Sequence, residues 1–291
     1  MLHPSGVSEG KGIAAHAALA TLAAGRLAGR LGLDAWGLNV LHSSNNTITH
    51  LPRCGLIAKV GTAPDAPETL TRELAIGLHL LTEDAEIAPP ATCVSPGPYR
   101  QDGLVITLWE FGEHDPDAEF DDDELADSLE RLQARLATWS GELPDYRERI
   151  RRTERLLNDD QAMRAMPRDG LELVRARFAE VAKPLLERAK PTQVLHGGPH
   201  SHNVLSTPFG LRWIDFETCC RGPLEADLAY LGEAGARRPG VDVELLALAG
   251  QMLRISVATI CWSYPDRHPR IREAAEYHLA ALTHEEPRTP G

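Results

Sequence analysis

The chain has 291 residues, of which 43% are hydrophobic and 25% charged, a balance typical of a globular protein with one large domain or two lobes. Its formal net charge of −12 argues against nucleic acid as a partner and allows a cationic substrate. The five cysteines are odd in number and form no C-x-x-C pair, which predicts reduced thiols and a cytoplasmic location.

The first predicted element is a helix over residues 13–32, rich in alanine and leucine, with a wide apolar face. His16, Arg26 and Arg30 interrupt this stretch, so no apolar run reaches the ~20 residues that a membrane span needs. No basic leader with a cleavage site is present. We therefore expect neither a signal peptide nor a membrane partner.

Residues 38–60 predict three short strands joined by a polar turn. The strands are expected over 38–41, 48–51 and 56–60, and the turn over 43–47 is rich in serine and asparagine. Hydroxyl and backbone N–H groups of such a turn can donate to phosphate oxygens. A plain hairpin turn has the same composition, and the turn taken alone favours that interpretation.

Lys59 ends the third strand, and a helix is expected over residues 66–81. The apolar residues at helical spacing in it are Leu70, Leu74, Leu78 and Leu81. A lysine at a strand end is usually only solvated, and Glu73 in the helix could be a surface partner of a residue one turn away. A function for these two residues can be inferred only together with motifs nearer the C-terminus.

The remainder of the chain is mainly helical. Residues 89–100 are rich in proline and predict turns, and a strand is expected over 102–113. Helices are expected over 120–139, 145–166, 169–190, 223–231, 242–261 and 268–282. Asp121 to Glu124 lie at a helix start, where they fit the helix dipole better than they fit a site for a cationic substrate.

The most informative stretch runs from residue 194 to 231. It predicts a strand, a loop over 196–203, and a hairpin whose second strand spans 211–216. Asn203 and Asp215 stand at the near and far ends of this hairpin and could hold a cation between them. Mg²⁺ prefers such oxygen ligands, usually one or two carboxylates together with substrate phosphates.

The loop reads HGGPHSHN from His196 to Asn203, and Ile-Asp-Phe lies around Asp215. A further segment, GPLEADLAYL, contains Asp227. This arrangement resembles the aminoglycoside phosphotransferase family, whose catalytic loop reads His-Gly-Asp-x-His-x-x-Asn. The resemblance covers about residues 38–260 and implies an α+β, two-lobed protein-kinase-like fold. A small lobe with a five-stranded antiparallel sheet would comprise residues 1–111, and a mainly helical large lobe residues 112–291.

The resemblance also implies roles for individual residues. Lys59 would touch the nucleotide phosphates and Glu73 would hold Lys59. The turn residues expected over the phosphates are Ser43, Ser44, Asn46 and Thr47. The backbone from Trp109 to Phe111 would bond the adenine edge, although Trp109 could be simple core. The remaining roles are Mg²⁺ binding by Asn203 and Asp215, bracing of the catalytic loop by Asp227, and a supporting or solvent-facing position for Glu217.

The sequence departs from the family at Gly198, where the family has the catalytic aspartate. Loss of a general base typically costs about 10²–10⁴ in rate, but phosphoryl transfer relies mainly on positioning and charge neutralisation. His200 is the nearest replacement, since an imidazole titrates near ~6.5. We favour the alternative that His200 is the loop histidine that the family keeps beside its aspartate, held by hydrogen bonds.

The resemblance therefore implies a small-molecule phosphotransferase that moves the γ-phosphoryl group of ATP or GTP to a substrate hydroxyl, with Mg²⁺ as cofactor. The acceptor hydroxyl would enter near Gly198 and His200. Two alternatives remain open: a pseudokinase-like nucleotide-binding protein, which Gly198 favours, and a choline- or amino-acid-type small-molecule kinase.

Overall fold

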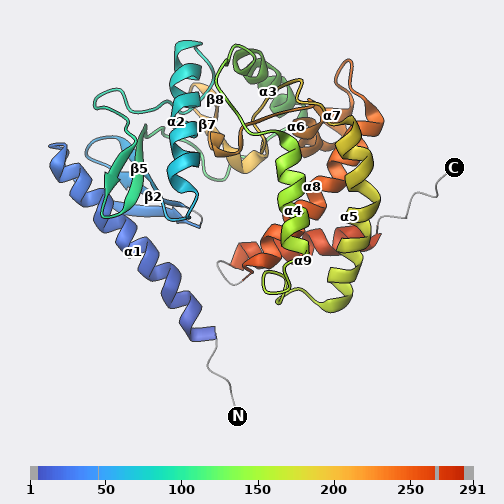
Figure 1. The fold of residues 1–291 in the computed structure, drawn as a ribbon. Coiled ribbons are helices and arrows are strands. Elements are labelled where there is room, and N and C mark those ends of the chain that lie inside the picture. The colour runs from blue at the N-terminus through green and yellow to red at the C-terminus, as the bar shows by residue number, and fades with distance from the viewer. Residues whose placement is uncertain (1–5, 45, 266–268, 285–291) are drawn as a thin grey trace. The chain divides into compact units, whose positions relative to one another are not determined.

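Figure 1 shows the fold in a computed structural model, which describes residues 6–44, 46–265 and 269–284. The chain divides into two compact units, Met1–Gly141 with His196–Cys219, and Glu142–Leu195 with Cys220–Gly291. The expected lobe boundary near residue 112 lies within the first unit, and the two lobe ranges stay a prediction. Asn45 of the polar turn and the expected helix start at residue 268 lie outside the described residues.

The first unit contains the expected five-stranded antiparallel sheet, in the order β1-β2-β3-β5-β4. Its strands are β1 (Asn39–Ser43), β2 (Asn46–Leu51), β3 (Leu56–Gly61), β4 (Tyr99–Gln101) and β5 (Leu104–Glu110). Strand β4 was not predicted, because the prolines before it indicated only turns. The polar turn connects β1 and β2, as expected, but it is shorter than the predicted range 43–47, because Ser43 belongs to β1 and Asn46 and Thr47 belong to β2.

Alternate residues of the sheet point to opposite faces, and one face is covered by α1 (Gly6–Arg30) (Figure 1). Ala20, Ala23 and Leu27 of this helix share a buried core with the strand residues Leu51, Leu56, Ala58, Val60, Ile106 and Leu108. The predicted helix is confirmed, although it begins at Gly6 and not at residue 13. Because Ala58 and Val60 face α1, Lys59 between them faces the opposite side of the sheet.

Helix α2 (Ala66–Thr82) packs at a glycine against β5. A Cβ atom at Gly77 would lie 2.8 Å from the ring of Trp109, so only glycine allows this approach. The buried leucines of α2 are Leu70, Leu74 and Leu80. The predicted stripe was wrong in its second half, since Leu78 and Leu81 are exposed; the buried face rotates toward Gly77 and Leu80 to accommodate the indole.

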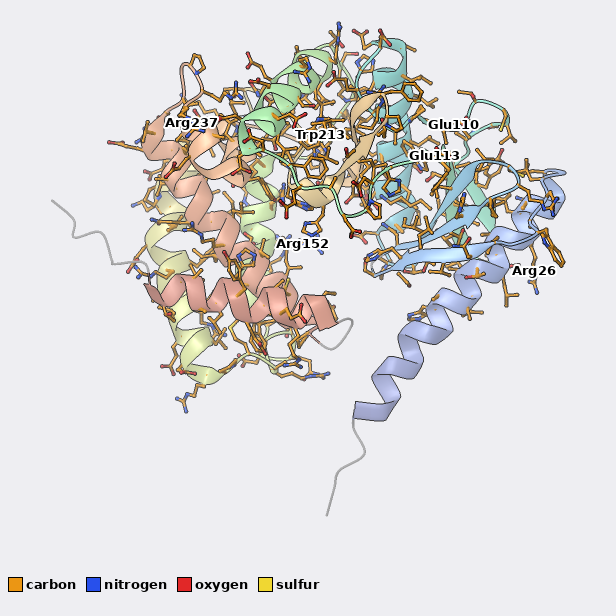
Figure 2. The ribbon with its side chains drawn as sticks, turned by 180° about the vertical axis from the view of Figure 1, so that it is seen from behind. Arg26, Glu110, Glu113, Arg152, Trp213 and Arg237 are labelled. Atoms are coloured by element: carbon orange, nitrogen blue, oxygen red, sulfur yellow. The ribbon has the colours of Figure 1, made fainter. Side chains whose placement is uncertain are left out.

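A two-stranded hairpin and a helix complete the first unit. The hairpin consists of β7 (Val204–Thr207) and β8 (Gly210–Trp213), and the helix is α3 (Asp122–Leu136). Asp121 caps α3 by accepting hydrogen bonds from two backbone N–H groups, so the acidic run there serves the helix start. Trp213, labelled in Figure 2, is fully buried and donates its indole N–H to the Ser128 hydroxyl of α3 at 3.0 Å.

The strand predicted over 211–216 ends at Trp213, which corrects the sequence-based prediction. Asp215 has φ 68°, in the left-handed region, and is followed by a short 3₁₀ helix, η2 (Phe216–Thr218). A non-glycine residue in this region is uncommon and concentrates at functional sites. The bend turns the Asp215 side chain out of the hairpin pattern.

The second unit is mainly helical, as expected. Its elements are α4 (Tyr146–Leu157), α5 (Arg168–Arg188), α6 (Glu225–Leu228), η3 (Ala229–Leu231), α7 (Gly232–Ala236), α8 (Val243–Ser263) and α9 (Pro269–His284), with the strand pair β6 (Gln193–Leu195) and β9 (Cys220–Gly222). Helix α7 was not predicted, because its five residues carry no apolar periodicity.

Among the described residues, α8 is long and apolar enough to cross a membrane by length and composition. The core helix of a soluble protein has the same properties. Met252, Ile255 and Ala258 of α8 are buried in the core of the second unit together with Val174 and Leu185 of α5.

Candidate active site

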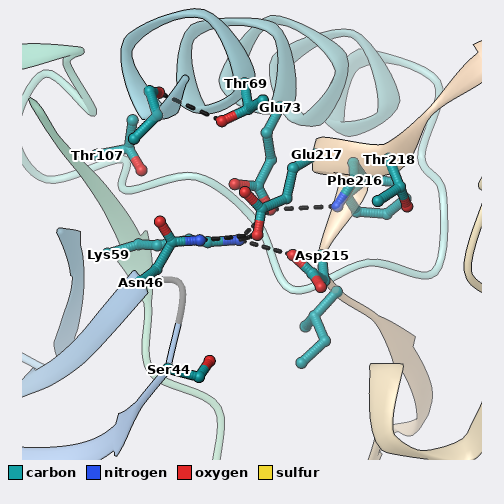
Figure 3. A network of polar contacts seen from close by, with 12 residues as sticks. Ser44, Asn46, Lys59, Thr69, Glu73, Thr107, Asp215, Phe216, Glu217 and Thr218 are labelled. Atoms are coloured by element: carbon teal, nitrogen blue, oxygen red, sulfur yellow. Dashed lines mark hydrogen bonds and ion pairs between the residues drawn. The ribbon is translucent and has the colours of Figure 1, made fainter. Parts of the chain in front are cut away.

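Lys59 is the centre of a buried ion-pair cluster in the first unit (Figure 3). Its ammonium lies 2.9 Å from Glu73 Oε1 of α2 and 2.7 Å from Asp215 Oδ1, which precedes η2. It also lies 3.2 Å from Glu217 Oε1. The predicted pair of Lys59 with Glu73 is therefore present in the geometry, and it includes two further carboxylates.

Burial and charge act against each other in this cluster. Burial lowers the pKa of Lys59, but the three carboxylates outweigh it, and the pKa is raised. Burial raises the pKa of Glu73 to about 7. Burial also opposes ionisation of Asp215, but the Lys59 ammonium outweighs it and lowers the pKa to about 2. Three carboxyl groups thus share one ammonium, an arrangement short of positive charge that favours an added cation.

Glu73 connects α2 to the segment after β8. Its Oε1 accepts hydrogen bonds from Lys59 and from the backbone N–H of Phe216, the latter at 3.2 Å. Its Oε2 is buried and has no hydrogen-bond partner among the described residues. Glu73 is only 2% exposed, so the surface role considered for it does not apply.

Glu217 lies against the cluster and not in solvent. Its Oε1 accepts a hydrogen bond of 2.7 Å from the side-chain amide of Asn46 in β2. Its backbone carbonyl accepts one of 3.0 Å from the guanidinium of Arg72 in α2. Burial raises the pKa of the Glu217 carboxyl. The sequence offered a weak signal for this contact, since Glu217 stands two residues after Asp215.

The candidate phosphate-binding residues of the β1–β2 turn separate into two groups. Asn46, opposite Gly61 in the register, reaches Glu217 on the Lys59 face of the sheet. The hydroxyls of Ser43 and Thr47 lie 3.0 Å apart, and Thr47 pairs with Val60, which places both on the face that α1 covers. Ser44 lies within the turn, where its N–H donates to the Asn46 carbonyl at 2.9 Å.

The loop from His196 to Asn203 is anchored by its first and last residues. His196 is fully buried; its Nε2 donates to the Ile214 carbonyl at 3.1 Å, and its Nδ1 accepts from the Gly198 N–H at 3.3 Å. The Asn203 amide nitrogen donates to the Gly198 carbonyl at 2.9 Å. The Ile214 N–H donates to the Asn203 carbonyl at 3.0 Å, so Asp215 comes directly beside Asn203.

Gly198 occupies a position that has room for a Cβ atom. A Cβ atom there would meet Thr218 Oγ1 at 3.4 Å and Asn203 Nδ2 at 3.6 Å, which are ordinary contacts. Its φ lies outside the positive range that favours glycine. Neither crowding nor backbone conformation therefore requires glycine at this position.

His200 is held beside Asn203. Its Nε2 lies 3.3 Å from the Asn203 amide nitrogen, which makes Nε2 the acceptor in a neutral ring. Burial lowers the pKa of the imidazole. This geometry fits the interpretation of His200 as a loop histidine fixed by hydrogen bonds, while its use as a base stays a prediction.

Some groups of the segment expected to bind adenine already make hydrogen bonds within the protein. The Trp109 ring packs against Gly77 and its indole N–H donates to Thr107, so its side chain is core. The Phe111 N–H donates to the Gly55 carbonyl at 2.8 Å. The Phe111 ring stacks on His50 with 4.0 Å between centroids, and burial lowers the pKa of that histidine. His50 was not identified from the sequence, because an isolated strand histidine carries no signal.

A cavity of about 310 Å³ lies at the end of β5. It is lined by residues 87–89, by Glu110 to Glu113 (labelled at both ends in Figure 2), and by hairpin residues that include Leu205, Phe209 and Arg212. Its lining includes neither Lys59 nor Asp215. These two members of the charged cluster therefore do not line the cavity.

The donor set fits a divalent cation bound together with phosphates. No group of three histidine, cysteine or acidic residues able to hold a metal occurs in the described part of the chain. The Asn203 amide nitrogen is fixed by hydrogen bonds, and its oxygen accepts none from the described residues. Asn203 and Asp215 together offer two oxygen ligands, a number that suits Mg²⁺ when phosphates supply the rest.

Asp227, expected to brace the catalytic loop, lies in α6 of the second unit and is fully buried. Its bracing role stays a prediction.

Comparison with known proteins identifies the family of this chain. A model of the phosphotransferase enzyme family, APH, matches residues 44–255. No curated protein sequence matches the chain. The choline kinase LicA from Streptococcus pneumoniae has a similar structure, with a TM-score of 0.61 and 14% sequence identity over 90% of this chain and 99% of that one.

Two further solved structures are similar. Spectinomycin phosphotransferase APH(9)-Ia, in complex with ADP and spectinomycin, has a TM-score of 0.60 at 13% identity, covering 89% of this chain and 96% of that one. Amicoumacin kinase hAmiN, in complex with AMP-PNP and Ca²⁺, has a TM-score of 0.51 at 14% identity, covering 87% and 83%. The chain has a protein-kinase-like fold and belongs to the APH phosphotransferase enzyme family.

Proposed function

We propose that the protein transfers the γ-phosphoryl group of ATP or GTP to a hydroxyl group of a small molecule in the cytoplasm. The observation that carries the proposal is the cluster of Lys59 with Glu73 and Asp215, drawn from three elements of the first unit. A buried lysine held by a helix carboxylate beside a metal-binding acid is the arrangement that kinases use to orient nucleotide phosphates. Such a cluster has no evident structural purpose, because well-packed apolar residues would stabilise the fold as well.

Each residue has a role in this proposal. Lys59 binds the phosphates, and Glu73 holds Lys59 in place. Asn46 donates to phosphate oxygens through its side-chain amide, whereas the Ser43 and Thr47 hydroxyls face away. The stacked rings of His50 and Phe111 offer a flat apolar surface to the base. The Glu110 and Phe111 N–H groups already donate within the fold. Hydrogen bonds to the adenine edge would then come from carbonyl groups of β5 or from the backbone of Gly112 and Glu113.

Asn203 and Asp215 would hold Mg²⁺, which neutralises phosphate charge when it is bound. The ADP in the spectinomycin phosphotransferase structure and the AMP-PNP and Ca²⁺ in the amicoumacin kinase structure support a nucleotide with a divalent cation. The acceptor hydroxyl would enter near Gly198 and His200. With no carboxylate at residue 198, positioning and charge neutralisation supply the rate, and turnover is slow.

A catalytically inactive nucleotide-binding protein is the second candidate, and Gly198 is the observation that favours it. An assay with γ-labelled ATP and GTP against a panel of acceptors distinguishes the two. The panel contains aminoglycosides, spectinomycin, choline and hydroxy amino acids, and an Asp215→Asn variant is the control. Label on an acceptor that is absent with the variant supports transfer. Nucleotide binding without label on any acceptor supports the second candidate.

A further inference from the structure

One carboxylate oxygen of Glu217 engages two donors that the proposed function assigns to the nucleotide. Oε1 accepts from the Asn46 amide at 2.7 Å and lies 3.2 Å from the Lys59 ammonium (Figure 3). Asn46 belongs to β2 and Lys59 to β3, and both are at least nine-tenths buried. An oxyanion with one N–H donor and one ammonium has the surroundings that a phosphate oxygen receives at a kinase site.

The backbone of η2 holds the Glu217 side chain in this position. The Arg72 guanidinium donates to the Glu217 carbonyl at 3.0 Å, and the Phe216 N–H donates to Glu73 Oε1 at 3.2 Å. Both partners belong to α2, so this helix holds the main chain of η2 at two points. The Glu217 side chain is 20% exposed, which leaves it reachable by an entering anion.

The negative charge of Glu217 disfavours the approach of an anion to the donors Asn46 and Lys59. Lys59 already pairs with Glu73 and Asp215 at 2.9 and 2.7 Å. A third carboxylate adds negative charge to donors that an anionic phosphate must also reach. The same two donors cannot serve the Glu217 oxygen and a phosphate oxygen at full strength.

We propose that Glu217 is an internal competitor of the nucleotide: its carboxylate occupies the phosphate donors Asn46 and Lys59, and the phosphates displace it when they bind. The inference rests on the proposed function, because it assigns those donors to phosphate. It makes Glu217 a residue that sets nucleotide affinity.

The test measures the Kd of ADP by isothermal titration calorimetry in EDTA, so that no divalent cation contributes. Glu217→Gln keeps the size of the side chain and an oxygen that can accept from Asn46, but removes the charge. ADP should bind this variant about tenfold more tightly than the wild type, as expected when one charged hydrogen-bond competitor is removed. Glu124→Gln removes an exposed charge from the start of α3 and should leave the Kd unchanged.

Two further variants keep the test decisive. Glu217→Asp withdraws the carboxylate by one methylene and should tighten ADP binding by a smaller factor, which gives an answer if Glu217→Gln does not fold. Asn46→Ala should weaken ADP binding in the Glu217→Gln background, because the freed donor is then absent.

The outcomes separate this inference from the proposed function. If wild type binds Mg-ATP but Glu217→Gln binds metal-free ADP equally or more weakly, the competitor role is wrong and the nucleotide site stands. Detectable ADP binding in Glu217→Gln alone supports the competitor role. If neither protein binds any nucleotide, with or without Mg²⁺, both the competitor role and the proposed function are wrong.

Discussion

The Lys59 ammonium and the Asp215 carboxylate lie 2.7 Å apart although 156 positions separate them in the chain. The contact joins the third strand of the sheet to the bend after β8, where Asp215 takes its left-handed backbone conformation. The strand with Lys59 and the bend with Asp215, both predicted to bind nucleotide or metal, therefore contact each other in the first unit. Both the stability of this unit and its binding of nucleotide should depend on this ion pair.

Removal of Lys59 should destabilise the protein. Lys59→Met leaves Glu73, Asp215 and Glu217 without their ammonium, and removing one partner of a buried ion pair costs about 3 kcal/mol because the opposite charge stays behind uncompensated. Urea unfolding of both proteins measures the difference. Lys183→Met, which removes an exposed lysine of α5, should change the free energy of unfolding by less than about 0.5 kcal/mol. Equal stability of Lys59→Met and wild type would contradict the cluster.

Replacement of Gly198 by aspartate should raise the rate of transfer to an accepted substrate. The position has room for Cβ, and a general base contributes about 10²–10⁴ in rate. Steady-state kinetics give kcat for this variant and for Gly198→Asn, which has the same size but no base and should stay near the wild-type rate. A rate for Gly198→Asp at or below that of Gly198→Asn would indicate that His200 or the shape of the loop matters more.

Gly77 should not tolerate a methyl group. Gly77→Ala would place Cβ 2.8 Å from the Trp109 ring, and overpacking of this kind costs about 1–3 kcal/mol. Gly250→Ala in α8 is the matched control, because no atom lies within 4 Å of its Cβ position. It should stabilise the protein by about 0.5–1 kcal/mol through helix propensity. Thermal unfolding compares the two, and similar effects for both would contradict the α2–β5 packing.

The cysteines should differ strongly in reactivity toward Ellman's reagent. Cys93 is exposed, whereas Cys219 and Cys220 are buried, and burial raises the pKa of Cys220 to about 11. Since the thiolate is the nucleophile, Cys220 should stay unreactive from pH 7 to 9 in the folded protein. Cys93→Ser should remove the fast phase, and all five thiols of wild type should react in denaturant. Rapid reaction of Cys220 in the native protein would argue against this core.

Local sequence patterns predicted the elements well and their ends less well. The alternation in β2, β3 and β5 and the leucines of α2 indicated the sheet and its helix because burial decides both. The strand predicted through Asp215 stopped at Trp213 because the Ile214 N–H and the Phe216 N–H find partners in Asn203 and Glu73, outside any ladder. Such partners come from distant segments, and no local window contains them.

The structure brings together Lys59 with Glu73, and Asn203 with Asp215, as the family resemblance implied, while the roles of these residues stay predictions. The site was not predictable where a contact depends on side-chain direction. Asn46 and Thr47 are neighbours of similar polarity, but the strand alternation sends only Asn46 to Glu217. The stacking of His50 on Phe111 likewise depends on the register between β2, β3 and β5.

The most direct test of the central claim, that the Lys59 cluster binds nucleotide phosphates, is a thermal unfolding scan with and without Mg-ATP and Mg-GTP. A ligand at a hundredfold excess over Kd stabilises by about 2.7 kcal/mol, which raises the Tm of a chain of this size by several degrees. We expect a magnesium-dependent rise in the Tm of the wild type that is lost in Asp215→Asn. No rise with either nucleotide, or an equal rise in Asp215→Asn, would contradict it.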